Sequence, residues 1–377
     1  MTVGLALRAN PRAPFVRTIT VAGAPAGVKS AATHLARRNI VALLNLRLRN
    51  VLTCAALALA GAGAIAVGSN PREFARAHGG VVRLSIATGN TGGVYYPYGG
   101  ALAKVIGESL RVQATAEVTA GTVDNLKLIQ QRKVDIAFAL ADTLDAALQG
   151  SGPFQRTGAV RARTLAGLYP NYTHVATIAG TRIDRLTDLR GRVVSTGSPG
   201  SGTEVIALRT LRAAGLDPDR DVRRQALSVN ASVDAIKDGK IDAFFWSGGL
   251  PTASILDLSS AIGITARLLS NDEVVATLQR EYGSALYSRL VMPKGSYPGM
   301  TSDVGVVGVQ NVLVVHEAME EQLAYDLTWV LFEKQAELAR IHPEARHLSL
   351  ARAVEGSPAP FHAGAVRFYR ERGAWKQ

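Results

Sequence analysis

The 377-residue chain has a globular composition, with 47% hydrophobic residues and one cysteine, but 42 Lys and Arg against 30 Asp and Glu give it a net charge of +12. Eight basic and no acidic residues fall within the first 66 positions, which leaves 34 basic against 30 acidic residues in the rest. Because the excess belongs to one terminal segment, and no basic run with interleaved aromatic residues follows it, the composition argues against nucleic-acid binding.

The first 66 residues have the features of an export signal. Arg47 and Arg49 precede an uncharged stretch at residues 51–66 that ends in Ala64-Ile65-Ala66. A basic flank, a short apolar run and a small-x-small end are typical of a secretory signal peptide. We therefore expect residues 1–66 to be an N-terminal extension and signal peptide. The alternative is a retained membrane anchor, for which the run is short, because a spanning helix takes about 20 apolar residues.

From residue 81 onward, short apolar runs alternate with segments of helical periodicity, which predicts an α/β fold. Strands are expected at residues 81–87, 112–118, 134–140, 175–178, 192–195, 241–246 and 308–315. Helices are expected at residues 97–110, 123–131, 202–214, 232–238 and 319–341. The last helix should end before Pro343, because the residue preceding a proline usually leaves the helix.

An internal repeat at an offset of about 108 residues predicts two similar lobes. Glycine-rich turns at residues 88–92 and 196–200 each follow a strand and precede a helix, and Asp135 and Asp242 each open a later strand. We interpret the repeat as a structural duplication; chance similarity is the alternative. Both aspartates are expected to hold a backbone turn rather than to act in acid/base chemistry.

We divide the chain into three parts on this basis. The proposed parts are 1–66 for the extension and signal peptide, 79–170 with 251–377 for lobe 1, and 171–250 for lobe 2.

The turn at residues 196–204 can bind an anion. Its small residues let the backbone bend around a ligand, and the unpaired N–H groups of the helix that follows favour a carboxylate or phosphate. Ser201 or Thr203 acting only as a helix cap is the alternative. ATP and dinucleotide binding are excluded, because no Lys precedes Thr203 and Gly200-Ser201-Gly202 is followed by Val205.

Two further turns offer ligand contacts. Tyr95, Tyr96 and Tyr98 surround a helix start after the turn at residues 89–94, and tyrosine combines an apolar face with a hydroxyl. The segment 121–125 opens another helix with Thr and Asn side chains that either cap it or contact a ligand. Asp142 is a weaker candidate for the pocket, and Trp246 is expected in the core.

Catalytic and metal-binding patterns do not stand out. The histidines form no H-E-x-x-H sequence, and no G-x-S-x-G elbow occurs. We therefore expect no metal, no cofactor and no enzymatic activity.

Several motifs together resemble one known family. The segments IATGNTGGVYYP (86–97), GTVDNL (121–126), GSPGSGTE (197–204), YPG (297–299) and APFHAGA (359–365) look like those of the TAXI-family solute receptors of TRAP transporters. The resemblance covers roughly residues 81–373 and implies a two-lobed clamshell of the type II periplasmic-binding-protein kind. It departs around residues 246–250, where family members more often carry smaller residues.

The resemblance also implies a function and a site. Such a receptor is periplasmic and monomeric, and hands a small organic anion, such as glutamate or a dicarboxylate, to the membrane permease subunits of an ion-gradient-driven TRAP transporter. The expected ligand-binding residues are Asn90, Thr91, Gly92, Gly93, Tyr95, Tyr96, Thr122, Asn125, Ser198, Ser201, Gly202 and Thr203. The lobes are expected to close over the ligand at hinges near residues 169–172 and 246–250. A module that signals to a membrane kinase and an enzyme on this fold are the alternatives.

Overall fold

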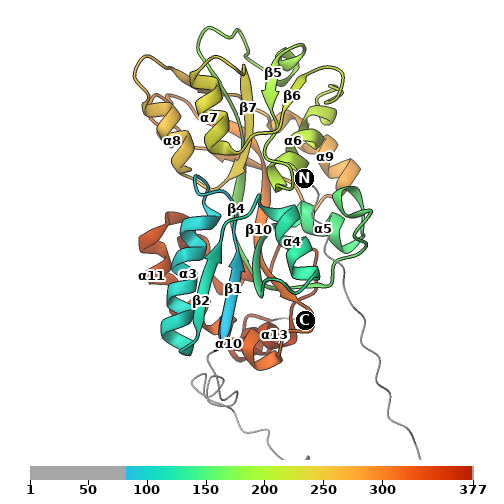
Figure 1. The fold of residues 1–377 in the computed structure, drawn as a ribbon, viewed down its shortest axis with the longest axis vertical. Helices are drawn as coiled ribbons and strands as arrows, with labels where there is room; N and C mark the ends of the chain where they lie inside the picture. The colour runs from blue at the N-terminus through green and yellow to red at the C-terminus, as the bar shows by residue number, and fades with distance from the viewer. Residues whose placement is uncertain (1–81, 376–377) are drawn as a thin grey trace, which may run out of the picture. The chain divides into compact units, whose positions relative to one another are not determined.

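Two long antiparallel strands, β4 (Ala162–Ile178) and β10 (Val304–His316), lie side by side in the computed structural model, which describes residues 82–375 (Figure 1). Residues in the middle of both strands are buried, as expected for strands covered on both faces. Only residues 175–178 and 308–315 were predicted as strand here. The predicted signal peptide lies outside the described residues.

A first lobe surrounds one part of these strands (Figure 1). Its N-terminal elements are β1 (Arg83–Ala87), α3 (Tyr95–Leu110), β2 (Gln113–Glu117), α4 (Thr122–Gln130), β3 (Ile136–Leu140) and α5 (Ala141–Leu148). Its C-terminal elements, which follow β10, are α10 (Glu321–Glu333), α11 (Gln335–Ile341), the 3-10 turn η4 (Pro343–His347), α12 (Leu350–Ala353) and α13 (Ala363–Glu371). This lobe is therefore built from two separate stretches of chain.

A second lobe is formed by the chain between β4 and β10. Its elements are β5 (Val193–Ser195), α6 (Gly202–Ala213), β6 (Arg223–Gln225), α7 (Val229–Lys237), β7 (Ala243–Gly248), α8 (Ala253–Ser260), β8 (Ala266–Leu268), α9 (Val275–Tyr282) and β9 (Ser288–Met292). Ile255, Leu258 and Met292 share one apolar cluster with Phe244 of β7. On this packing we propose moving residues 251–303 from lobe 1, where the sequence division put them, to lobe 2.

One sheet continues through both lobes, in the order β2-β1-β3-β10-β4-β7-β5-β6, with β8 beside β4 and β9 beside β10. β1 pairs in parallel with β2 and β3, and β5 pairs in parallel with β6 and β7. β10 pairs antiparallel with β3, and β4 pairs antiparallel with β7. The α/β class and the two-lobed arrangement of the type II periplasmic binding proteins are thus confirmed.

The two parallel units repeat a detail of their sequences. The Asp135 carboxylate accepts the Ser85 N–H at 2.8 Å, and the Asp242 carboxylate accepts the Val193 N–H at 2.7 Å. In both lobes the aspartate thus binds a backbone N–H of the neighbouring strand, that of the third residue of β1 and that of the first residue of β5. The two aspartates hold backbone, but that of a neighbouring strand instead of the predicted turn, and they occupy equivalent places in the repeat.

One predicted helix differs from the structure. Residues 319–341 form two helices, α10 and α11, which are separated at Lys334. The break lets Leu338 of α11 turn into the core cluster that Leu327 and Leu331 of α10 also enter. The predicted end before Pro343 is confirmed, since α11 ends at Ile341.

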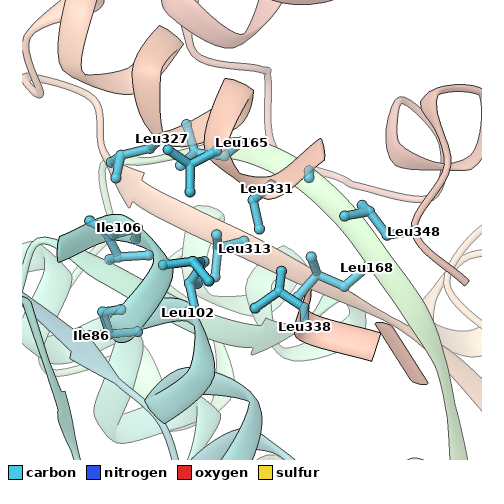
Figure 2. Close-up of a cluster of buried hydrophobic side chains, with 14 of the residues drawn as sticks. Ile86, Leu102, Ile106, Leu165, Leu168, Leu313, Leu327, Leu331, Leu338 and Leu348 are labelled. Atoms are coloured by element: carbon cyan, nitrogen blue, oxygen red, sulfur yellow. The ribbon is translucent and has the colours of Figure 1, made fainter. Parts of the chain in front are cut away.

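The core of the first lobe lies between α3, α10 and α11 and the sheet. Figure 2 shows leucine and isoleucine side chains from these helices meeting others from β1, β4 and β10. Leu102 and Ile106 of α3 and Leu165 of β4 are almost fully buried. Burying each such side chain contributes about 1.5–3 kcal/mol, and this packing fixes the strand ends near which the site lies.

Candidate functional site

A cavity lies between the lobes, where the strand-to-helix turns of both meet. It encloses about 540 Å³ with its opening to solvent included. It is lined by Gly89, Asn90, Gly93, Val94, Tyr95, Ala120, Gly121, Thr122, Leu140, Tyr169, Asn171, Gly197, Ser198, Ser201, Gly202, Thr203, Val229, Trp246, Ser247 and Gly248. A cavity of this volume suits a small molecule.

Two helices from opposite lobes begin at this cavity. Thr122 is the first residue of α4, and Gly202 and Thr203 are the first two of α6. In the described residues the backbone N–H groups of these three have no hydrogen-bond acceptor. The first N–H groups of a helix lack intrahelical partners and carry the positive end of the helix dipole. Two such ends at one cavity favour an anion.

Ser201 caps α6, as the alternative interpretation proposed. Its hydroxyl oxygen accepts the Glu204 N–H at 3.1 Å and its own hydrogen goes to the Ser198 carbonyl at 2.6 Å. The cap uses the N–H of Glu204, the third residue of α6. It leaves the N–H groups of Gly202 and Thr203 free. Capping and anion binding are therefore compatible at this helix.

The floor of the cavity is a hydrogen-bonded layer on β4 and β10. Asn311 accepts the Tyr95 hydroxyl and donates to the Asn171 side chain at 3.1 Å, and Asn171 in turn donates to the Ser247 hydroxyl. Tyr169 lies in this floor, is 1% exposed, and its hydroxyl has no partner. Burial raises the pKa of the Tyr169 hydroxyl well above its ordinary value, so it stays protonated.

Four of the predicted site residues do not line the cavity. Thr91 and Tyr96 are exposed, and Gly92 lies under α8, where its carbonyl accepts the Ser254 hydroxyl. Asn125 is fully buried, and its amide donates to the Thr88 and Phe138 carbonyls at 2.7 and 2.8 Å. Asn125 ties α4 to β1 and β3, so its contribution to the site is indirect.

Several lining residues were missed from sequence. Tyr169 and Asn171 had been assigned only to a hinge, because most of β4 was not predicted. Trp246, expected in the core, lines the cavity and donates from its indole nitrogen to the Thr252 hydroxyl at 2.9 Å. Ser247 and Gly248 could have been found from their position in the sequence. They follow the apolar residues of β7, at the edge of the sheet where the other turns lie.

The lobes touch directly around the cavity. The Asp124 N–H of α4 donates to the Gly200 carbonyl at 3.0 Å. A Cβ atom added to Gly93 would lie 2.7 Å from the Trp246 ring, and one added to Gly202 would lie 2.7 Å from Leu140. These distances leave no room for a larger residue at either glycine, so the structure represents a closed arrangement of the lobes.

Asp142 lies outside the cavity, contrary to its weak assignment to the pocket. Its carboxylate is fully buried and pairs with Arg209 of α6 at 3.2 Å, and it accepts the Tyr287 hydroxyl at 2.9 Å. It therefore binds the start of α5 to the helix that opens at the cavity.

A buried acid faces the loop that follows β7. Glu344 of η4 is 2% exposed and accepts the Leu250 N–H, while His347 lies 3.4 Å from its other oxygen. Burial raises the pKa of Glu344 to about 7. The loop is thus tied to the first lobe at the place predicted as a hinge.

The described part of the chain holds neither a metal-binding cluster nor a helix that could span a membrane. Between residues 82 and 375, no cluster of His, Cys, Asp and Glu is arranged to hold a metal ion. In the same range no helix has the length and apolar character needed to span a bilayer.

Solved structures of solute-binding proteins resemble this chain. The periplasmic aliphatic sulphonate binding protein of Escherichia coli is 13% identical, with 78% of this chain and 84% of that chain covered and a TM-score of 0.40. The alkanesulfonate-binding protein of Xanthomonas axonopodis pv. citri is 16% identical, with 77% and 91% covered and a TM-score of 0.44. A phosphonate-transporter binding component of Pseudomonas aeruginosa is 11% identical, with 70% and 79% covered and a TM-score of 0.45.

The sequence itself gives the more specific match. A family model matches residues 86–373, a range that holds every residue lining the cavity. The chain therefore belongs to the NMT1-like family.

Proposed function

We propose that this protein is an extracytoplasmic receptor that captures a small carboxylate between its lobes and delivers it to a membrane permease. The observation that carries the proposal is the pair of helix N-termini, α4 from one lobe and α6 from the other, that open on one cavity with free N–H groups at Thr122, Gly202 and Thr203. A carboxylate bound there is stabilised by both lobes at once. Binding without chemical conversion is sufficient for this role.

The same geometry supplies a mechanism of closure. In an open arrangement the ligand meets α6 alone, and closure adds the N-terminus of α4 and the residues around Gly93. Because these contacts exist only when the lobes meet, the ligand binds the closed arrangement more tightly and shifts the population toward it. The strands β4 and β10 and the loop held by Glu344 are the proposed hinges.

A thermal-shift screen of the full chain tests the binding role. The protein is first unfolded, dialysed and refolded to remove any bound molecule, then mixed with pyruvate, succinate, 2-oxoglutarate or glutamate. An acid present at 100 times its dissociation constant adds about 2.7 kcal/mol to the free energy of unfolding. We expect at least one clear shift, confirmed by calorimetric titration. A folded protein that responds to no carboxylate contradicts the proposal.

The proposed partner is a TRAP permease, on the strength of the sequence motifs at residues 86–97 and 197–204. The similar solved structures include binding components of ABC transporters, so an ATP-driven permease is the competing partner. Uptake of the identified acid distinguishes them. Loss of uptake when the ion gradient is collapsed at constant ATP supports the TRAP partner, and loss only on ATP depletion at constant gradient contradicts it.

A further inference from the structure

We propose that the cavity selects organic anions that carry no cationic amino group, so that an oxo, hydroxy or simple carboxylic acid binds better than the corresponding amino acid. This inference rests on the proposed function and names the class of ligand for the same cavity. It is argued from the hydrogen-bonding state of the groups that line the walls.

Three hydroxyl groups in the wall already use their oxygen as an acceptor. The Thr122 hydroxyl accepts the Leu140 N–H at 3.2 Å, and the Thr203 hydroxyl accepts the Ser247 N–H at 3.2 Å. The Ser247 hydroxyl accepts the side-chain amide of Asn171. A hydroxyl that accepts in this way can still donate its hydrogen. The Thr122 hydroxyl hydrogen-bonds to the Tyr95 hydroxyl, whereas the hydrogens of Thr203 and Ser247 remain available for a ligand. The polar wall is therefore weighted toward donors.

The backbone adds donors and no balancing charge. The N–H groups of Thr122, Gly202 and Thr203 are without acceptors, as described above. Among the lining residues in the described part of the chain, none is an aspartate or glutamate. Two carboxylates lie next to the cavity, Asp124 against Gly200 and Glu204 directly after Thr203, and neither is in the wall.

Tyr169 independently indicates a ligand. Its hydroxyl is buried in the cavity wall without a partner, and an unpaired buried hydroxyl carries a desolvation penalty that a ligand oxygen can remove. As a protonated phenol it can donate to an oxo or carboxylate oxygen. The Tyr169 hydroxyl is thus suited to bind a second oxygen of the ligand.

An ammonium group would meet the reverse situation. On closure it would lose its water and find no negative charge in the wall, and an unpaired buried charge is strongly unfavourable. Its hydrogens would also compete with wall groups that are themselves donors. Binding of an amino acid therefore carries a desolvation cost that binding of an oxo acid of the same shape does not.

Matched pairs of ligands test the inference directly. Calorimetric titration of the refolded full chain with 2-oxoglutarate and L-glutamate, and with pyruvate and L-alanine, compares acids that differ only at the amino-bearing carbon. We expect the oxo acid of at least one pair to bind more than tenfold tighter than its partner. Equal or tighter binding of both amino acids overturns the inference and leaves the receptor function in place. Failure of every acid to bind overturns both.

Variants locate the selectivity in this cavity. Tyr169→Phe removes the unpaired wall hydroxyl and should weaken binding of the oxo acid about tenfold. Tyr98→Phe is the matched control. The Tyr98 ring stacks on that of Tyr169 with their centres 6.0 Å apart, and its hydroxyl is also buried without a partner. Tyr98 does not line the cavity. Tyr98→Phe should leave the affinity unchanged. Equal effects of the two variants overturn the assignment of the second oxygen to Tyr169.

A separate variant addresses one of the neighbouring acids. If an amino acid binds through Asp124, the change Asp124→Asn abolishes that binding, and this outcome overturns the inference. We expect Asp124→Asn to leave the preference for the oxo acid intact.

Discussion

Glu344 is a carboxylic acid held away from water beside the loop that follows β7. It accepts the Leu250 N–H, and His342 of the same turn approaches the Pro251 carbonyl at 3.2 Å. Burial raises the pKa of Glu344 to about 7, and the hydrogen bond from Leu250 partly opposes this rise. His347, whose pKa is lowered by burial, is the titratable group that faces its second oxygen. Protonation of Glu344 therefore makes the attachment of the loop after β7 to the first lobe dependent on pH.

The sign of this linkage can be tested. The folded protein holds the Glu344 proton more tightly than the unfolded chain, so its stability falls as pH rises from about 4.5 to about 7. This rise in the Glu344 pKa corresponds to about 3 kcal/mol of unfolding free energy lost over that pH range. Glu344→Gln keeps an acceptor for Leu250 without this titration. Urea unfolding should therefore show the variant gaining stability relative to wild type between pH 4.5 and pH 8.

A surface change serves as the control. Glu333→Gln alters a carboxylate that is 40% exposed and paired with Arg372. It should not reproduce the pH-dependent gain. If Glu344→Gln differs from wild type by the same amount at both pH values, the buried acid does not titrate as described.

At the level of elements, α6 does more than present its N-terminus to the cavity. Two turns further along, Arg209 pairs with the buried Asp142 of α5 at 3.2 Å and donates to the Tyr287 hydroxyl at 2.7 Å. Its guanidinium also lies 4.3 Å from the centre of the Tyr282 ring. The helix that opens at the cavity is thus anchored to both lobes.

Removing one member of the buried pair should be costly. Asp142→Asn leaves the Arg209 guanidinium without its counter-charge, and breaking a buried pair in this way costs about 3–5 kcal/mol of unfolding free energy. Asp257→Asn removes the exposed partner of Lys237, 62% exposed, and should cost less than about 1 kcal/mol. Urea unfolding of both variants makes the comparison. Similar small losses would show that the buried pair does not hold α5 to α6.

The elements differ in how far the sequence predicted them. β1, β2, β3, α4 and α6 were found because each has a clear apolar period; a glycine-rich turn follows β1, and glycines stand at the starts of α4 and α6. α5 was missed because it follows β3 without any turn residue, and Leu140 passes directly into Ala141. Most of β4 was missed because polar residues such as Asn171, Thr173 and His174 interrupt its apolar pattern. Asn171 and His174 are buried because they pair with Asn311 and Tyr297, which are distant in the chain and which no local pattern contains.

The site was predicted in part for the same reason. Ser198, Ser201, Gly202 and Thr203 belong to one local turn, and the structure brings them to the cavity. Tyr169 and Ser247 reach it from strands whose pairing joins residues far apart in the chain. Tyr96 was selected for its side chain alone, but its helix turns that side chain to solvent, and it is 38% exposed.

For the whole molecule, closure depends on small residues at the contact between lobes. A Cβ atom at Gly202 would lie 2.7 Å from the Leu140 side chain and 2.9 Å from the Thr122 hydroxyl. Gly202→Ala should therefore hold the lobes apart and weaken carboxylate binding at least about tenfold, with little loss of unfolding free energy. Titration and small-angle scattering with and without ligand check both effects.

Gly100 provides the matched control for this change. It lies on α3, and a Cβ atom there meets nothing within 4 Å. Gly100→Ala should leave affinity unchanged and stabilise the helix by up to about 1 kcal/mol. Unaltered affinity in Gly202→Ala would mean that the ligand binds without the lobes meeting at this point.

The place of β10 in the sheet also governs the order of folding. β10 lies between β3 and β4, although it follows them by more than a hundred residues. During synthesis, β3 and β4 emerge early but cannot be joined in one sheet until residues 304–316 have left the ribosome. Such distant pairings form slowly. The chain accordingly spends most of its synthesis without its central strand, an interval that suits the proposed extracytoplasmic role, because export as an unfolded polypeptide requires a chain that has not yet folded.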